Sequence, residues 1–247
     1  MLGQAGKKYI KHLGYTYLKS SYKKDYIKRI TTASYVASIF AGNNIEFIPS
    51  FELKDCSDFR TQARPFIGSI RFNENDFLVY YISNKSTKHF CNSIIYDFQR
   101  EHTYKQAILF VENFDMLKLE DYVFGSNQFL IIPLPHEKWI QLFNEQFKID
   151  YRAILDELKY NNYFISQWYF CDYETINKKF ITFLPFFDCE KIYKLMIFGK
   201  ENKKLINNVH IICSKEVSII LKNMLPFLKV DVVNFKSYLK EIKIYNI

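Results

Sequence analysis

The triplet with the clearest potential for catalysis is Glu52-Leu53-Lys54, an acid-x-lysine pattern after an apolar segment. On a strand both charged side chains would share one face, because side chains alternate with a period of two. A carboxylate of this kind holds Mg²⁺ and a nearby lysine helps to orient the attacking water, so the chemistry would be metal-dependent phosphodiester hydrolysis. The second carboxylate would have to come from Glu46, with no hairpin turn between the two acids. Such triplets also arise by chance in a lysine-rich chain.

Other residue types that carry chemistry lack the spacing of a site. The five histidines form no H-x-x-x-H or H-E-x-x-H pair, and His89 with Cys91 would give a metal only two ligands. The five cysteines form no C-x-x-C pair, which argues against a zinc ribbon or a disulfide framework and favours a reducing cytoplasm. The sequence shows no Walker loop, dinucleotide-binding glycine pattern or nucleophile elbow. We therefore expect no cofactor and no metal ion.

Positive charge is concentrated at the start of the chain. Residues 1–30 hold eight basic residues and one acid, which gives +7 of the formal net charge of +8. The predicted DNA-binding residues are Lys7, Lys8, Lys11, Lys19, Lys23, Lys24, Lys28 and Arg29. Five tyrosines are interleaved with them, and tyrosine can hydrogen-bond a phosphate or stack on a base. The segment predicts contact with a polyanion, although charge alone also fits a solvated helix face.

The composition excludes several other classes. Aromatic residues make up 18% of the 247 residues and only 7 are glycine, which is unlike a disordered or collagen-like chain. No apolar run reaches the roughly 18 to 20 residues of a membrane span, and no signal peptide is visible. The basic segment also lacks the clean apolar face of a helix that lies on a membrane. We expect a cytoplasmic protein with no membrane contact.

The hydrophobic spacing predicts a mixed α/β fold. The first part is expected to contain a helix over 22–41, an extended segment over 45–51, a hairpin over 67–82, strands at 107–111 and 129–132, and helices at 114–122 and 139–147. The C-terminal third is expected to contain helices capped by Asp150 and by Ser214, strands at 180–187, 191–198 and 209–213, and extended segments at 230–233 and 238–244.

This order indicates three parts. They are a basic helical segment (1–44), an α/β core (45–148) and a C-terminal α/β portion (149–247). The sequence of hairpin, strand, helix, strand, helix occurs at about 67–147 and again at 181–242, so the last part is either a degenerate duplication or part of one larger sheet. The edges of a sheet, such as the segment 77–82, must be covered or paired, and apolar surface left exposed after folding would form an interface. We therefore expect a homodimer.

Two short phrases of the chain, residues 2–14 and the stretch from Arg64 to Gly68, are similar to motifs of a known family. The first resembles the L-T-x-x-G-x-x-x-L-x-x-x-G end of a winged-helix domain and the second resembles an R-P-D-G turn, both of the replication-relaxation family, which includes MobC-like accessories of plasmid mobilisation. The order of elements over roughly 1–145 is also similar. The resemblance implies DNA binding and a restriction-endonuclease-like core. Only the tail of the winged helix matches, so the DNA-reading element is missing, supplied elsewhere or replaced by the basic segment.

The resemblance also implies where nuclease carboxylates would stand. The acid of the R-P-D-G turn corresponds to Phe66, and the next strand reads Tyr80-Tyr81-Ile82-Ser83-Asn84. Aromatic rings and an amide cannot replace paired carboxylates around a hard cation. We therefore expect a non-catalytic DNA-binding accessory protein that works with DNA and protein partners in replication or mobilisation of a plasmid or mobile element. The alternatives are a divergent Mg²⁺-dependent nuclease using Glu46, Glu52 and Lys54, and an interaction or oligomerisation module without DNA binding.

Overall fold

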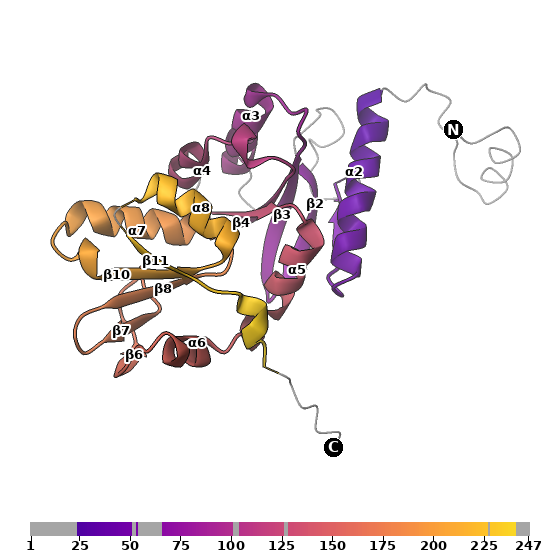
Figure 1. Cartoon of the computed structure of the whole chain (residues 1–247). Helices are drawn as coiled ribbons and strands as arrows, with labels where there is room; N and C mark the ends of the chain where they lie inside the picture. The colour runs from indigo at the N-terminus through magenta and orange to yellow at the C-terminus, as the bar shows by residue number, and fades with distance from the viewer. Residues whose placement is uncertain are drawn as a thin grey trace, which may run out of the picture.

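Two mixed β-sheets, each covered by helices, form the described part of the chain (Figure 1). The computed structural model describes residues 24–50, 53, 66–100, 104–125, 128–226 and 228–240. The fold class is mixed α and β, as the hydrophobic spacing predicts. Among the helices of these segments, none combines the length and the apolar character that a bilayer crossing requires.

The first sheet follows helix α2 (Lys24–Ala41) and has the spatial order β1-β2-β3-β4-β5-β9. Its strands are β1 (Phe47–Pro49), β2 (Phe66–Phe72), β3 (Asn75–Ile82), β4 (Gln106–Val111), β5 (Phe129–Pro133) and β9 (Phe187–Asp188). The first three pair antiparallel, β3, β4 and β5 run parallel, and β9 is antiparallel to β5. The connections contain α3 (Lys88–Arg100), η2 (Phe114–Met116) and α4 (Leu119–Gly125), and α5 (His136–Glu145) and η3 (Gln146–Lys148) follow β5.

The second sheet repeats this strand order. It follows α6 (Tyr151–Glu157) and contains β6 (Tyr163–Ile165), β7 (Tyr173–Thr175), β8 (Phe180–Leu184), β10 (Val209–Cys213) and β11 (Lys229–Val232). Again three strands pair antiparallel and the last three run parallel. The crossovers contain α7 (Cys189–Glu201), η4 (Ile206–Asn208) and α8 (Lys215–Met224), and η5 (Phe235–Tyr238) follows β11. The short strand β9 is the exception, because it leaves this part of the chain to pair with the first sheet.

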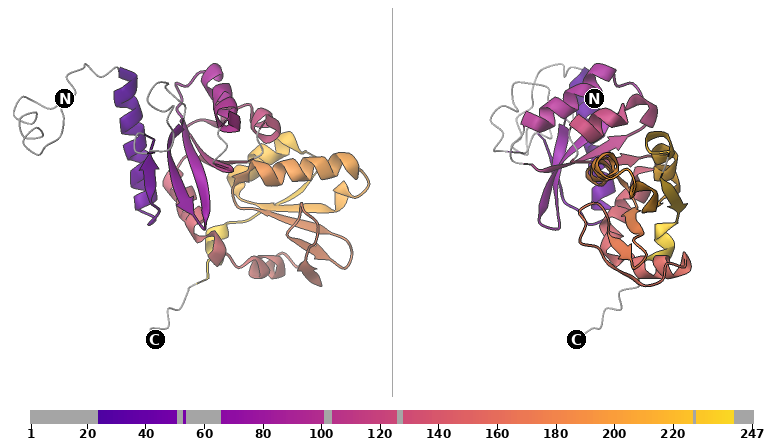
Figure 2. Two further views of the ribbon diagram at one scale, coloured as in Figure 1. Left: turned by 180° about the vertical axis from the view of Figure 1, so that it is seen from behind. Right: turned by 90° about the vertical axis from the view of Figure 1, so that its left-hand side faces the viewer.

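Two apolar cores lie on the two faces of the sheets, and alternate residues of each strand point into them. In β3, Leu78 and Tyr80 pack with helices α3, α4 and α7, whereas Val79 packs with α2 and α5. In β4, Leu109 belongs to the same core as Leu78 and Tyr80, and Phe110 belongs to the same core as Val79. Figures 1 and 2 show α2 and α5 on one side of the first sheet, and α3 and α4 on the other. Because both faces of these sheets are covered, the sequences of the parallel strands are continuous runs of apolar residues.

Several predicted elements are confirmed. The hairpin corresponds to β2 and β3, and the strands at 107–111, 129–132 and 209–213 correspond to β4, β5 and β10. Asp150 caps α6 by accepting a hydrogen bond from the Ala153 N–H at 3.2 Å. Ser214 caps α8 in the same way, with the Val217 N–H 3.4 Å from its Oγ. Local capping chemistry therefore identified these two helix starts correctly.

Other predicted elements are wrong. The segment 191–198 is helical and lies within α7, where Ile192, Leu195 and Phe198 are buried at a spacing of three. The segment 77–82 is no sheet edge, because it belongs to β3, which lies between β2 and β4. The predicted helix at 114–122 is split into η2 and α4. The extended segment expected at 238–244 does not include Tyr238, which is the last residue of η5; the backbone is extended at Leu239, and residues 241–247 lie outside the described residues.

Candidate nucleic-acid interface and buried polar clusters

The basic segment is only partly within the described chain. Lys7, Lys8, Lys11, Lys19 and Lys23 lie outside the described residues. The other three predicted contacts lie near the start of α2, at Lys24, Lys28 and Arg29. Farther along this helix, the side chains of Val36, Ile39 and Phe40 are buried against the first sheet. The helix thus joins the end of the basic segment to the core.

Two buried aromatic side chains occupy the positions at which the resemblance would place nuclease acids. Phe66 and Tyr80 are both 0% exposed, and they are register partners on β2 and β3. Their ring centroids are 6.2 Å apart in an edge-to-face arrangement, a favourable geometry for aromatic rings. The Tyr80 hydroxyl donates a hydrogen bond to Asp97 Oδ2 of α3 at 3.1 Å. This part of the sheet is therefore packed as apolar core.

Only one of the three residues of the alternative nuclease site lies within the described residues. Glu46 is exposed and lies one residue before β1, whereas Glu52 and Lys54 fall outside the described residues. Within the described segments, no group of three histidine, cysteine, aspartate or glutamate side chains is arranged to hold a metal ion.

A buried histidine at the start of α5 connects three elements of the first half. His136 is 0% exposed, with its Nε2 3.2 Å from the Val111 carbonyl oxygen and its Nδ1 3.1 Å from the Tyr35 hydroxyl. Because a carbonyl oxygen only accepts, Nε2 carries the proton and Nδ1 accepts from the Tyr35 hydroxyl, which also lies 3.4 Å from Glu137 Oε1. Burial lowers the pKa of His136, while burial and then Glu137 raise the pKa of Tyr35. The pair is thus neutral at pH 7, and Tyr35 is a hydrogen-bond donor rather than a nucleophile.

A second tyrosine and histidine pair joins the second sheet to the segment between α6 and β6. The Tyr160 hydroxyl donates to Asp231 Oδ2 at 3.0 Å and lies 2.8 Å from His210 Nδ1. Since the hydroxyl has one proton, His210 donates its Nδ1–H to the tyrosine oxygen. Burial, followed by the charges of Lys229 and Lys179, lowers the pKa of His210. The sequence gave no signal for either tyrosine partner, since each lies 50 or more residues from its histidine.

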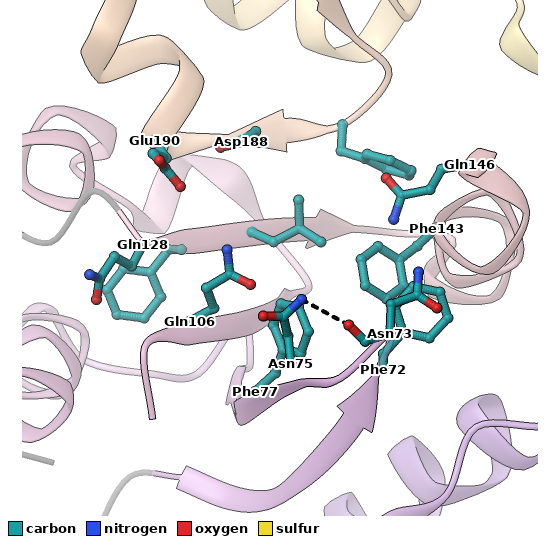
Figure 3. A pocket seen from close by; sticks show the side chains of 13 residues that line it. Phe72, Asn73, Asn75, Phe77, Gln106, Gln128, Phe143, Gln146, Asp188 and Glu190 are labelled. Carbon is teal, nitrogen blue, oxygen red and sulfur yellow. Dashed lines mark hydrogen bonds between the residues drawn. The ribbon is translucent and has the colours of Figure 1, made fainter. Parts of the chain in front are cut away.

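A cavity of about 210 Å³ lies beside the β2–β3 turn and the amino-terminal ends of β4 and β5 (Figure 3). Amide side chains line much of it, and Asn75 Nδ2 donates to the Asn73 carbonyl oxygen at 3.1 Å. Asp188 and Glu190 form an acidic wall, and burial raises the pKa of Asp188. The amides can donate and accept, Glu190 is already paired with Lys194 at 2.6 Å, and none of the described residues that line the cavity is basic. This cavity therefore suits a neutral polar group and offers phosphate no cation.

Comparison of the chain with protein-family models, with curated proteins and with solved structures finds no match.

Proposed function

We propose that the protein is a non-catalytic DNA-binding accessory protein of plasmid or mobile-element replication or mobilisation. The observation that carries the proposal is the charge distribution, because residues 1–30 hold +7 of the net charge of +8. Proteins that bind duplex DNA draw much of their affinity from basic side chains that replace counterions on phosphates. The protein acts in the cytoplasm, as a homodimer, with protein partners of the same replication or mobilisation complex.

The topology supports this proposal. Helix α2 is followed by three antiparallel strands, then by α3 and by β4 parallel to β3, which is the order implied by the resemblance to a restriction-endonuclease-like core. The aromatic pair of Phe66 and Tyr80 fills the positions where that core would carry its acids. A DNA-binding role without hydrolysis accounts for both features.

The test is DNA binding by a charge-reversed variant, measured by fluorescence anisotropy with a labelled duplex. We expect the triple variant Lys7→Glu, Lys8→Glu, Lys11→Glu to bind at least about tenfold more weakly than the unaltered protein. The matched control is Lys85→Glu, Lys203→Glu, Lys204→Glu, which makes the same change of net charge at exposed lysines elsewhere. Equal affinities for both triple variants would contradict the assignment of the contacts to residues 1–30.

A further inference from the structure

A second cavity, of about 370 Å³, lies where the two halves of the molecule meet. Helix α5 lines one side of it, and the start of α8 and the segment from β11 to η5 line the others. In Figure 1 the lower end of α5 lies close to the yellow segment that follows β11. The cavity is at the carboxyl ends of the parallel strands β10 and β11, where open α/β sheets commonly bind ligands.

The charge of this cavity is positive. Lys138, Lys215 and Lys236 line it, against the single acid Glu216. Lys138 pairs with Glu216 at 3.2 Å, whereas Lys236 donates to the neutral Gln141 Oε1 at 2.7 Å and keeps its charge uncompensated. The Lys215 ammonium group has no partner among the residues that the structure describes. Three cations and one anion give the lining of the cavity a formal net charge of +2.

Two further kinds of donor lie at or close to the same cavity. Helix α8 starts at Lys215, and the first N–H groups of a helix have no acceptor within it and carry partial positive charge. The Trp139 side chain also lines the cavity, is 2% exposed, and has an indole N–H without a hydrogen-bond partner in the described structure. A buried donor without an acceptor is costly. The surroundings therefore offer several donors and too few acceptors.

We infer that this cavity binds a phosphate group. Lysine side chains and the α8 amino terminus match the charge and the acceptor oxygens of phosphate. The phosphate could belong to a DNA backbone or to a free nucleotide or inorganic phosphate, which share this chemistry. The inference goes beyond the proposed function, because a free phosphate would bind here even if residues 1–30 bound no DNA.

The chain supplies its own reporter for the test. It contains two tryptophans, so Trp168→Phe leaves Trp139 as the only one, at the edge of the cavity. We expect inorganic phosphate to change the fluorescence of Trp139 with saturation, if the ligand is free phosphate. If the ligand is DNA, a short duplex changes the signal and inorganic phosphate does not. Calorimetric titration of the unaltered chain with the same two probes gives an independent measurement.

Substitutions then locate the binding. Lys215→Gln with Lys236→Gln should weaken binding by about tenfold or more, whereas Lys203→Gln with Lys204→Gln should not change it. Glu216→Gln should strengthen binding by about threefold, because it removes the one acid and frees Lys138. For the duplex, the comparison is repeated with Lys7→Glu, Lys8→Glu, Lys11→Glu, so that loss of the basic segment and loss of the cavity are distinguished. No saturable signal with either probe, or equal weakening in both glutamine pairs, would overturn the inference.

Discussion

Two buried histidines, His136 and His210, each share a hydrogen bond with a tyrosine far away in the sequence. The contacts fix α2 to α5 in the first half, and join β10 to the segment after α6 in the second. Because burial lowers the pKa of both histidines, neither is charged at neutral pH. Their role at the residue scale is to satisfy buried polar atoms while holding elements in place.

This arrangement predicts a pH dependence of stability. A histidine with a lowered pKa binds fewer protons in the folded than in the unfolded state, so its contribution is full above the unfolded pKa of about 6.5 and is lost as pH falls below it. Each histidine adds at most about 1.4 kcal/mol per pH unit to this loss. We expect His136→Gln to reduce the fall in unfolding free energy between pH 7.5 and pH 5.5, measured by urea denaturation. The raised pKa of Asp188 has the opposite effect, because it favours the folded state as pH falls, and this effect is the same in the unaltered protein and in His136→Gln. An identical fall in both proteins would contradict the account.

Gly68 should tolerate no side chain. A Cβ at this position would lie 2.5 Å from the Ile48 carbonyl oxygen and would overlap the ring of Phe47. The backbone of β1 cannot move away without breaking its pairing with β2. We expect Gly68→Ala to lower the unfolding free energy by about 1–3 kcal/mol or more in thermal or urea denaturation. Gly42→Ala is the control, because its Cβ would be 3.4 Å or more from its neighbours, and it should cost much less.

At the scale of elements, many helices and strands could be predicted from sequence because their signals are local. Alternation and continuous apolar runs identified the hairpin and β4, and the capping residues Asp150 and Ser214 identified two helix starts. Helix α7 was missed because its apolar residues are nearly continuous in sequence and resemble a buried strand. The two-residue strand β9 depends on pairing with β5, more than 50 residues away, so no local signal exists.

The nuclease alternative is also a question of how elements are arranged, because the acid-x-lysine triplet Glu52-Leu53-Lys54 follows strand β1 in the sequence. We expect Glu52→Ala to leave DNA binding intact and to remove no nuclease activity, because Phe66 and Tyr80 occupy the positions at which the resemblance would place nuclease acids. The measurement is incubation of plasmid and linear DNA with Mg²⁺ or Mn²⁺, for the unaltered protein and for the Glu46→Ala and Glu52→Ala variants. Metal-dependent cleavage that disappears in Glu52→Ala would favour the nuclease alternative instead.

For the whole molecule, the distribution of charge could be read from sequence, whereas the lysine-lined cavity could not. Lys138, Lys215 and Lys236 are widely separated in the chain, and only the packing of α5 against the end of the second sheet brings them together. The expected homodimer is also a property of the whole molecule. Strand β6 is an edge of the second sheet, and Phe164, Ile165 and nearby Ile176 are exposed there.

We therefore predict that β6 takes part in dimer formation, because an apolar edge strand readily pairs with another chain. Ile165→Lys should raise the dimer dissociation constant by about tenfold or more, measured by light scattering over a wide concentration range. The matched control is Ile219→Lys, which introduces the same charge at an exposed isoleucine of α8. A monomeric mass of the unaltered protein at every concentration, or an equal effect of both variants, would contradict this prediction.

The central claim is that the basic segment binds DNA phosphates, and its most direct test is the salt dependence of DNA affinity. Each phosphate contact contributes about −0.9 to the slope of log association constant against log salt concentration. With four to eight contacts from residues 1–30, we predict a slope between about −4 and −7, reduced in magnitude by about 2.7 in the variant Lys7→Glu, Lys8→Glu, Lys11→Glu. A slope near zero, or the same slope in the protein and its variant, would contradict the claim.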